Sequence, residues 1–348
     1  MHIVGARPQF IKVFVVIKAI RKKSKKIKNF LLHTGQHYDK KMSEIFFKEL
    51  QFKKPDYHID LKKNNDRTSN IAKMIKEIGK KIDVLKPSIV LIYGDTDSTL
   101  AGAISAKKKG VKLIHIEAGM RSHILSMAEE QNRLVADSLS DYFITVSKES
   151  TTNLIKEGVK KNKIYEFGDI MFDSLKQNKS KIKNHNKKKI KKPYIFFTLH
   201  RDENSNVKIL NTIAKKMSKL NYNIYWPVHP KISNLIKKNK ILFPKNLILN
   251  NPISYLETLY LILNSEFVVS DSGGVLREAY FLNKKTFILR NETEWPDLIK
   301  NNSAKLIGNN LELIINSKSF IRSKIKNRKS LGSGNSSKKI ASLVTNLD

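Results

Sequence analysis

The chain has 348 residues, 40% of them hydrophobic, which suits two domains that each bury a core, and no apolar run nears the roughly 20 residues that span a membrane. It contains no cysteine, which excludes disulfides, thiolate metal sites and cysteine nucleophiles and is typical of a cytoplasmic protein. The formal net charge is +35, but the lysines are dispersed among Asn and Ile, which favours a lysine-coated enzyme over a nucleic-acid binder.

Apolar runs alternate with helical patterns along the whole chain, which predicts α/β architecture with parallel sheets. The first half begins with a short strand at His2–Val4 and has a helical pattern at Thr99–Lys109. Its further strands are expected at Ser88–Tyr93, Leu113–Ile116 and Tyr142–Val146. This order is the strand–helix–strand rhythm of a doubly wound sheet.

The same rhythm restarts after residues 177–192, a polar, lysine-rich segment that is typical of a linker. The second half has a helical pattern at Val207–Leu220. Its strands are expected at Tyr194–Leu199, Asn223–Val228, Asn246–Leu249, Phe267–Ser270 and Thr286–Leu289. The sequence therefore predicts two Rossmann-like domains, 1–176 and 193–335. A C-terminal helix within 336–348 is expected to dock back on the first domain.

Polar residues follow these strands at the carboxyl ends, where open α/β sheets bind ligands. Each group by itself is more typical of a loop or helix cap, but six groups from both halves predict one shared cleft between the domains. The groups are Gly5-Ala6-Arg7-Pro8, Gly94-Asp95-Thr96-Asp97, Glu117-Ala118-Gly119, His200-Arg201, His229-Pro230 and Ser270-Asp271-Ser272-Gly273-Gly274.

Two of the patterns begin helices. Ser272-Gly273-Gly274 precedes the pattern Val275–Phe281, where glycines and free N–H groups suit a diphosphate, and Glu278 could accept hydrogen bonds from a ribose. The alternatives are a plain helix cap and a surface glutamate. Glu129-Glu130 precedes the pattern Asn132–Ser140, where acids could also simply complement the helix dipole.

Segments that run nearly end to end resemble the non-hydrolysing UDP-N-acetylglucosamine 2-epimerases. The matching segments are GARPQFIK (5–12), TGQHYD (34–39), YGDTDSTLAG (93–102), HIEAGMRS (115–122), EEQNRLVADSLSD (129–141), FGDIMFDSL (167–175), TLHRDEN (198–204), PVHP (227–230), SDSGGVLREAYFLNK (270–284) and LRNETEWPDLI (289–299). One departure is Ala128, which stands where the family usually has Pro before the two acids.

The resemblance implies a glycosyltransferase-B-like fold, a homodimer and a role in surface polysaccharide precursors, without metal, nicotinamide or flavin. It also implies the following residue roles. The catalytic residues would be Asp95, Glu117, Glu130 and His200. The residues that bind the UDP-sugar would be Arg7, Lys12, Arg201, His229, Ser272, Gly273, Gly274 and Glu278. A possible activator site would contain Gln36, His37 and Arg67.

The C2 hydrogen of such a sugar is not acidic, so the family's route is elimination of UDP to a 2-acetamidoglucal and re-addition. That route needs a base and an acid on opposite faces of the ring, and clustered carboxylates are expected to raise one pKa. The first three motifs look closest to a subgroup that acts on UDP-2,3-diacetamido-2,3-dideoxyglucuronate. The alternative enzyme functions are a glycosyltransferase of the same fold and a hydrolysing epimerase.

Overall fold

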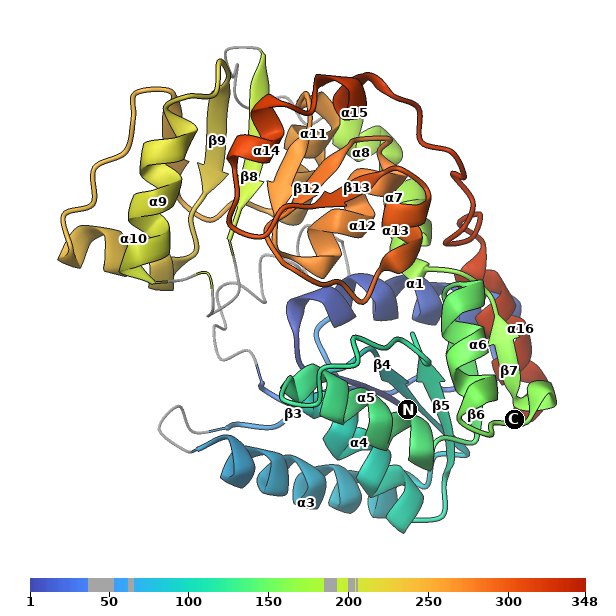
Figure 1. Cartoon of the computed structure of the whole chain (residues 1–348). Coiled ribbons are helices and arrows are strands. Elements are labelled where there is room, and N and C mark those ends of the chain that lie inside the picture. The colour runs from blue at the N-terminus through green and yellow to red at the C-terminus, as the bar shows by residue number, and fades with distance from the viewer. Residues whose placement is uncertain (37–52, 62–65, 185–192, 200–203, 205) are drawn as a thin grey trace. The chain divides into compact units, whose positions relative to one another are not determined.

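The computed structural model describes residues 1–36, 53–61, 66–184, 193–199, 204 and 206–348 (Figure 1). The chain forms two compact units, which are Met1–Lys176 with Lys329–Asp348, and Gln177–Arg328. Residues 329–335, expected in the second domain, thus belong to the first unit. Of the expected linker, 177–184 belongs to the second unit and contains helix α8 (Lys179–Lys183), while 185–192 lies outside the described residues.

The first unit is built on a parallel sheet of seven strands in the order β3-β2-β1-β4-β5-β6-β7. The strands are β1 (His2–Val4), β2 (Leu31–His33), β3 (Tyr57–His58), β4 (Ile89–Tyr93), β5 (Lys112–Ile116), β6 (Tyr142–Thr145) and β7 (Ile164–Glu166). The helices are α1 (Arg7–Lys23), α3 (Arg67–Leu85), α4 (Asp97–Lys108), α5 (Ala128–Leu139), α6 (Lys148–Lys156), α7 (Ile170–Gln177) and α16 (Ser336–Leu347), with a 3-10 turn η1 (Lys161–Lys163).

Strand β4 shows how this sheet is buried on both faces. Leu91 and Tyr93 face a core shared with α1 and α16, and the alternate residues Val90 and Ile92 face a core shared with α3 and α4. Helix α16 lies against α1, as Figure 1 shows, and places Ile340 in the first of these cores. The predicted docking of the C-terminal helix on the first domain is confirmed.

The second unit is a parallel sheet of six strands in the order β10-β9-β8-β11-β12-β13. The strands are β8 (Tyr194–Thr198), β9 (Asn223–Pro227), β10 (Leu247–Asn250), β11 (Val268–Ser270), β12 (Thr286–Ile288) and β13 (Ala304–Leu306). Besides α8, the helices are α9 (Val207–Met217), α10 (Pro230–Lys238), α11 (Tyr255–Asn264), α12 (Gly273–Phe281), α13 (Pro296–Lys300), α14 (Glu312–Ile315) and α15 (Lys318–Arg322).

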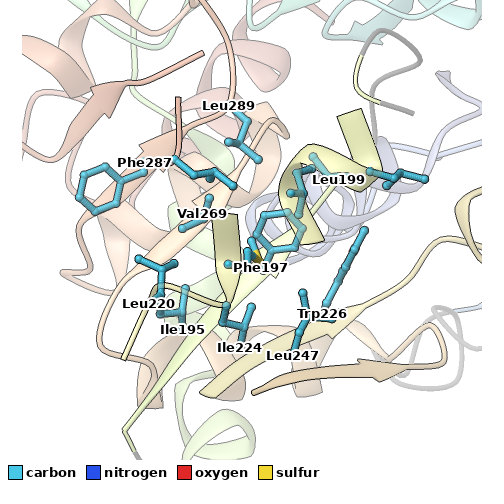
Figure 2. Close-up of a cluster of buried hydrophobic side chains, with 14 of the residues drawn as sticks. Ile195, Phe197, Leu199, Leu220, Ile224, Trp226, Leu247, Val269, Phe287 and Leu289 are labelled. Carbon is cyan, nitrogen blue, oxygen red and sulfur yellow. The ribbon is translucent and has the colours of Figure 1, made fainter. Parts of the chain in front are cut away.

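One core of the second unit covers the sheet face that carries α9 and α10. Figure 2 shows its strand residues, with Phe197 of β8 and Trp226 of β9 among them. Their rings meet edge to face with centroids 4.8 Å apart, a favourable aromatic geometry. Both side chains are fully buried, so the sheet is densely packed immediately below its carboxyl edge.

The predicted α/β class with parallel sheets is confirmed in both units. One helix start was predicted wrongly, because α5 begins at Ala128 rather than at Asn132. Glu129 and Glu130 therefore lie inside its first turn, where carboxylates favour the positive end of the helix dipole. In the part of the chain that the structure describes, no helix is long and apolar enough to cross a membrane.

Candidate active site

The strand order of the first sheet reverses between β1 and β4, which are neighbours. In open α/β sheets a crevice forms at such a point, because the loops after the two strands lead to helices on opposite faces. Here those loops are Gly5–Ala6 and Gly94–Thr96. The predicted strand-end residues of the first domain therefore lie at the place where this topology binds ligands.

Gln9 links these two loops through side-chain hydrogen bonds. Its side-chain oxygen accepts hydrogen bonds from the backbone N–H of Gly5 (2.7 Å) and Ala6 (3.0 Å). Its amide nitrogen donates to the carbonyl of Tyr93 (2.6 Å) and the hydroxyl of Thr96 (2.9 Å). Gln9 is buried, so this crosslink fixes the start of α1, where Arg7 is the first residue.

Arg133 joins two of the predicted catalytic carboxylates. Its Nη2 donates to Asp95 Oδ2 at 2.8 Å, and its Nη1 donates to Glu130 Oε2. The side chains of Arg133 and Glu130 are each 2% exposed, whereas that of Asp95 is 37% exposed. Asp95 is therefore the member of this trio that can reach a ligand.

Glu130 is saturated with hydrogen bonds. Besides Arg133, the backbone N–H of Ser122 (2.9 Å), its hydroxyl (2.9 Å) and the backbone N–H of His123 (3.0 Å) all donate to its two oxygens. Burial favours the neutral acid, but these hydrogen bonds and the charge of Arg133 outweigh it and lower the pKa of Glu130. The expectation that crowding raises a carboxylate pKa is therefore wrong for Glu130.

Glu117 forms a buried ion pair with Lys12 of α1. Glu117 has φ +76°, a left-handed conformation that is strained for a residue other than glycine and is often found at functional sites. A Cβ atom on Gly94 would lie 3.5 Å from Lys12 Nζ and 3.7 Å from Glu117 Oε2. The Lys12–Glu117 pair thus lies directly beside the Gly94-Asp95 segment, and the structure brings Asp95, Glu117 and Glu130 together.

The predicted activator residues that the structure describes both hold the turn between β4 and α4. Gln36 accepts from the backbone N–H (3.1 Å) and hydroxyl (2.6 Å) of Ser98. Arg67 donates from Nε to Asp97 Oδ2 at 2.9 Å, and Asn132 donates both to Asp97 Oδ1 (3.1 Å) and to the carbonyl of Asp95 (2.9 Å). A chain of polar contacts therefore runs from Arg67 to the backbone of Asp95.

The second sheet reverses its order between β8 and β11. Helix α12 follows β11 and begins at Gly273, so the N–H groups of its first turn are aligned at the carboxyl edge of the sheet. Thr198 at the end of β8 and Ser270 at the end of β11 share a hydrogen bond of 2.7 Å, and Ser270 accepts from the N–H of Ser272 at 3.0 Å. This arrangement can hold an anion such as a diphosphate.

The two glycines of this turn have different surroundings. A Cβ atom on Gly273 would lie 2.8 Å from Glu294 Oε1 and 3.2 Å from Trp295 Nε1, so a side chain at this position would displace Glu294. A Cβ atom on Gly274 would meet only Ser272 Oγ, at 3.8 Å, among the described residues. Gly274 is therefore the glycine whose open side would let a ligand approach the backbone closely.

The structure describes only some of the remaining predicted site residues. His229 is the exposed N-cap of α10, and its Nδ1 accepts from the N–H of Lys231 at 3.3 Å. Glu278 is buried on α12. His37, His200 and Arg201 lie outside the described residues, as does the side chain of Arg7.

The prediction missed Gln9, Asp97, Asn132 and Arg133 as site residues, although each lies within a motif that it quoted. A usable signal was present for Arg133, because it follows Glu130 by three residues on one helix and i,i+3 charges face each other. For Gln9, the signal was a Gln at the third helical position, which can accept a hydrogen bond from the N-cap backbone N–H.

The comparisons with known proteins agree with one another. The sequence profile of a family described as UDP-N-acetylglucosamine 2-epimerase matches residues 18–345. A Methanococcus maripaludis UDP-N-acetylglucosamine 2-epimerase homolog is 40% identical, covering 99% of both chains. A Pseudomonas aeruginosa UDP-2,3-diacetamido-2,3-dideoxy-D-glucuronate 2-epimerase is 37% identical, covering 91% of this chain and 90% of that protein.

A solved structure extends this agreement to the fold. It is the Methanocaldococcus jannaschii UDP-GlcNAc 2-epimerase, in complex with UDP-GlcNAc and UDP. The sequence is 32% identical, the TM-score is 0.89, and 99% of each chain is covered. The resemblance seen in the motifs therefore holds over the length of the chain and in its architecture.

Proposed function

Because the chain belongs to the UDP-N-acetylglucosamine 2-epimerase family, we propose that it is a non-hydrolysing isomerase that inverts carbon 2 of UDP-N-acetylglucosamine. The observation that carries this proposal is the cluster of Asp95, Glu117 and Glu130, each beside a cation, at the reversal point of the first sheet. A simple glycosyl transfer does not need three such carboxylates around one sugar.

The reaction proceeds by elimination and re-addition. A base removes the C2 proton, the C–H electron pair forms a C1=C2 double bond, and UDP leaves with the electrons of the C1–O bond. UDP then adds back at C1 while an acid delivers a proton to the opposite face of C2. The product differs from the substrate only in the configuration at C2, so no net oxidation takes place.

The three carboxylates differ in their contacts, and we therefore assign them different roles. Glu130 is buried and accepts from four donors, so it serves as a positioning residue that aims Arg133 at Asp95. Asp95 is partly exposed and Glu117 lies beside Lys12, so these two are the candidates for proton transfer on the two faces of the sugar.

The diphosphate of the substrate is assigned to the start of α12. Its N–H groups, with Gly274 as the point of close approach, stabilise the charge of the leaving UDP. His200, predicted as catalytic, and Arg201, predicted to bind UDP-sugar, are proposed as further contacts of the diphosphate.

Incubation of the purified protein with UDP-N-acetylglucosamine in deuterated water tests this function. The proposal expects deuterium at C2 of both epimers, while phosphorus NMR shows that UDP-sugar persists. Epimerised product that retains protium at C2 would exclude the elimination route. Steady release of UDP would instead identify a hydrolysing enzyme.

The substrate of the P. aeruginosa relative gives a second candidate, because that protein is 37% identical to this chain. We therefore propose UDP-2,3-diacetamido-2,3-dideoxyglucuronate as the alternative substrate. A turnover assay with both UDP-sugars decides between them, and the preferred substrate is the one with the higher kcat/KM.

The family also suggests the setting in which the enzyme works. We propose a cytoplasmic homodimer that supplies precursors for surface polysaccharides, which fits the absence of cysteine in the chain. Light scattering coupled to size exclusion measures the mass in solution. A mass near the 40.0 kDa of one chain would contradict the dimer.

A further inference from the structure

A buried charged network lies behind the turn that carries Glu117, and the proposed chemistry does not use it. His115 is fully buried on β5, and Asp137 of α5 is 4% exposed. Asp137 accepts from His115 Nδ1 at 2.6 Å, from Arg121 Nη1 at 2.7 Å and from the backbone N–H of Gly119 at 3.1 Å. Such a network is costly to bury unless its charges are matched and its hydrogen bonds are made.

The partners of His115 determine its protons. Nε2 lies 2.8 Å from the carbonyl oxygen of Gly94, which can only accept, so Nε2 carries a proton. Nδ1 faces Asp137, which two other donors already contact. Burial favours a neutral Asp137, but His115 and Arg121 outweigh it and hold the pKa of Asp137 below its usual value. Nδ1 of His115 therefore faces a group that favours its carboxylate form.

The ring is held at both ends, by Asp137 at Nδ1 and by the carbonyl of Gly94 at Nε2. Arg121, the other cation on Asp137, also binds Glu157, with Nε–Oε1 at 2.7 Å.

The far end of this donor reaches the candidate active site. Gly94 is held to β5 on both sides, since its N–H donates to the carbonyl of Ile116 at 2.9 Å and its own carbonyl accepts from His115. Gly94 precedes Asp95 and lies beside the Lys12–Glu117 pair. Asp137 meanwhile holds Gly119, two residues beyond the strained Glu117.

We propose that His115, held between Asp137 and the carbonyl of Gly94, is a positioning residue that aligns Gly94 and thereby Asp95 and Glu117 for proton transfer. This role rests on the proposed epimerase function. The ring acts only through the backbone, because it is fully buried and contacts Gly94 rather than a ligand.

The test compares two variants of similar size. In His115→Gln the amide nitrogen replaces Nε2 and keeps the bond to Gly94, whereas in His115→Asn it replaces Nδ1 and keeps only the bond to Asp137. We expect His115→Asn to lower kcat about 100-fold and His115→Gln less than about 10-fold, each with KM within about threefold. Deuterium exchange at C2 should fall in parallel.

A control separates positioning from loss of fold. Glu157→Gln removes the negative charge that pairs with the outer side of Arg121 without touching His115, and it should leave kcat unchanged. Equal kcat values for the two His115 variants, with both folded by circular dichroism, would overturn the positioning role. Absence of activity in the wild type would refute the epimerase function and with it this role, whereas an active wild type with equal variants would overturn the positioning role alone.

Discussion

Lys12 and Glu117 form a buried ion pair that joins the first turns of α1 to the end of β5. Their side chains are 5% and 10% exposed, so water screens the pair weakly. We expect Lys12→Met and Glu117→Gln to be coupled by about 2 kcal/mol in the free energy of unfolding. A double-mutant cycle in urea measures this coupling, and strictly additive single effects would contradict it.

Arg133 binds two carboxylates through two separate nitrogens, a geometry that the single ammonium of lysine cannot reproduce. We expect Arg133→Lys to lower kcat by about 100-fold, because Asp95 loses its fixed direction. The control is Lys109→Gln, which breaks the exposed pair with Asp83 and should change stability by less than about 0.5 kcal/mol. Full activity in Arg133→Lys would show that Asp95 is aimed by other contacts.

Acid should destabilise the first unit partly through Glu130. Its pKa is lower in the folded protein than the ordinary value of 4.5, so unfolding takes up protons below that pH. The stabilisation is therefore complete above about pH 4.5 and is lost as the pH falls through the folded-state pKa. Urea unfolding at several pH values should show a shallower loss in Glu130→Gln. If the free energy of unfolding fell equally with pH in both proteins, other acidic residues would account for the acid sensitivity.

The two glycines at the start of α12 should respond differently to alanine. Gly273→Ala places a methyl group against Glu294 and Trp295 and should cost about 2 kcal/mol of stability. Gly274→Ala adds a methyl group on the open side and should leave stability equal or slightly higher, yet weaken UDP binding. Calorimetry of unfolding and of UDP binding separates the two effects. Unchanged UDP affinity in Gly274→Ala would show that the diphosphate does not bind at this turn.

Asp173 of α7 caps α16, far along the chain. It accepts from the N–H of Ser337 at 2.8 Å, from its hydroxyl at 2.6 Å and from the N–H of Ser336 at 3.2 Å. We expect Asp173→Asn to cost about 1–2 kcal/mol, because the helix start loses a negative charge and an acceptor. Chemical denaturation measures the loss, with the exposed Lys338→Ala as control. Equal midpoints for both variants would contradict the cap.

Elements whose signal lies in their own residues were predicted well, whereas those fixed by contacts with other segments were not. The strand Ser88–Tyr93 was predicted almost to the residue, since an unbroken apolar run ending at a glycine carries its own signal. The start of α5 was missed by four residues, because Ala128 gives no capping signal of its own and the turn is fixed by hydrogen bonds from Ser122 and His123 to Glu130.

The sequence by itself determined the parallel α/β plan, the strand ends and the family motifs, because apolar periodicity and motif spacing are local properties of the chain. Only the tertiary structure decided which groups meet. Arg133 between Asp95 and Glu130, and His115 between Asp137 and Gly94, depend on the order in which the strands pair. That order arises from packing both faces of the sheet at once, which no single segment of sequence encodes.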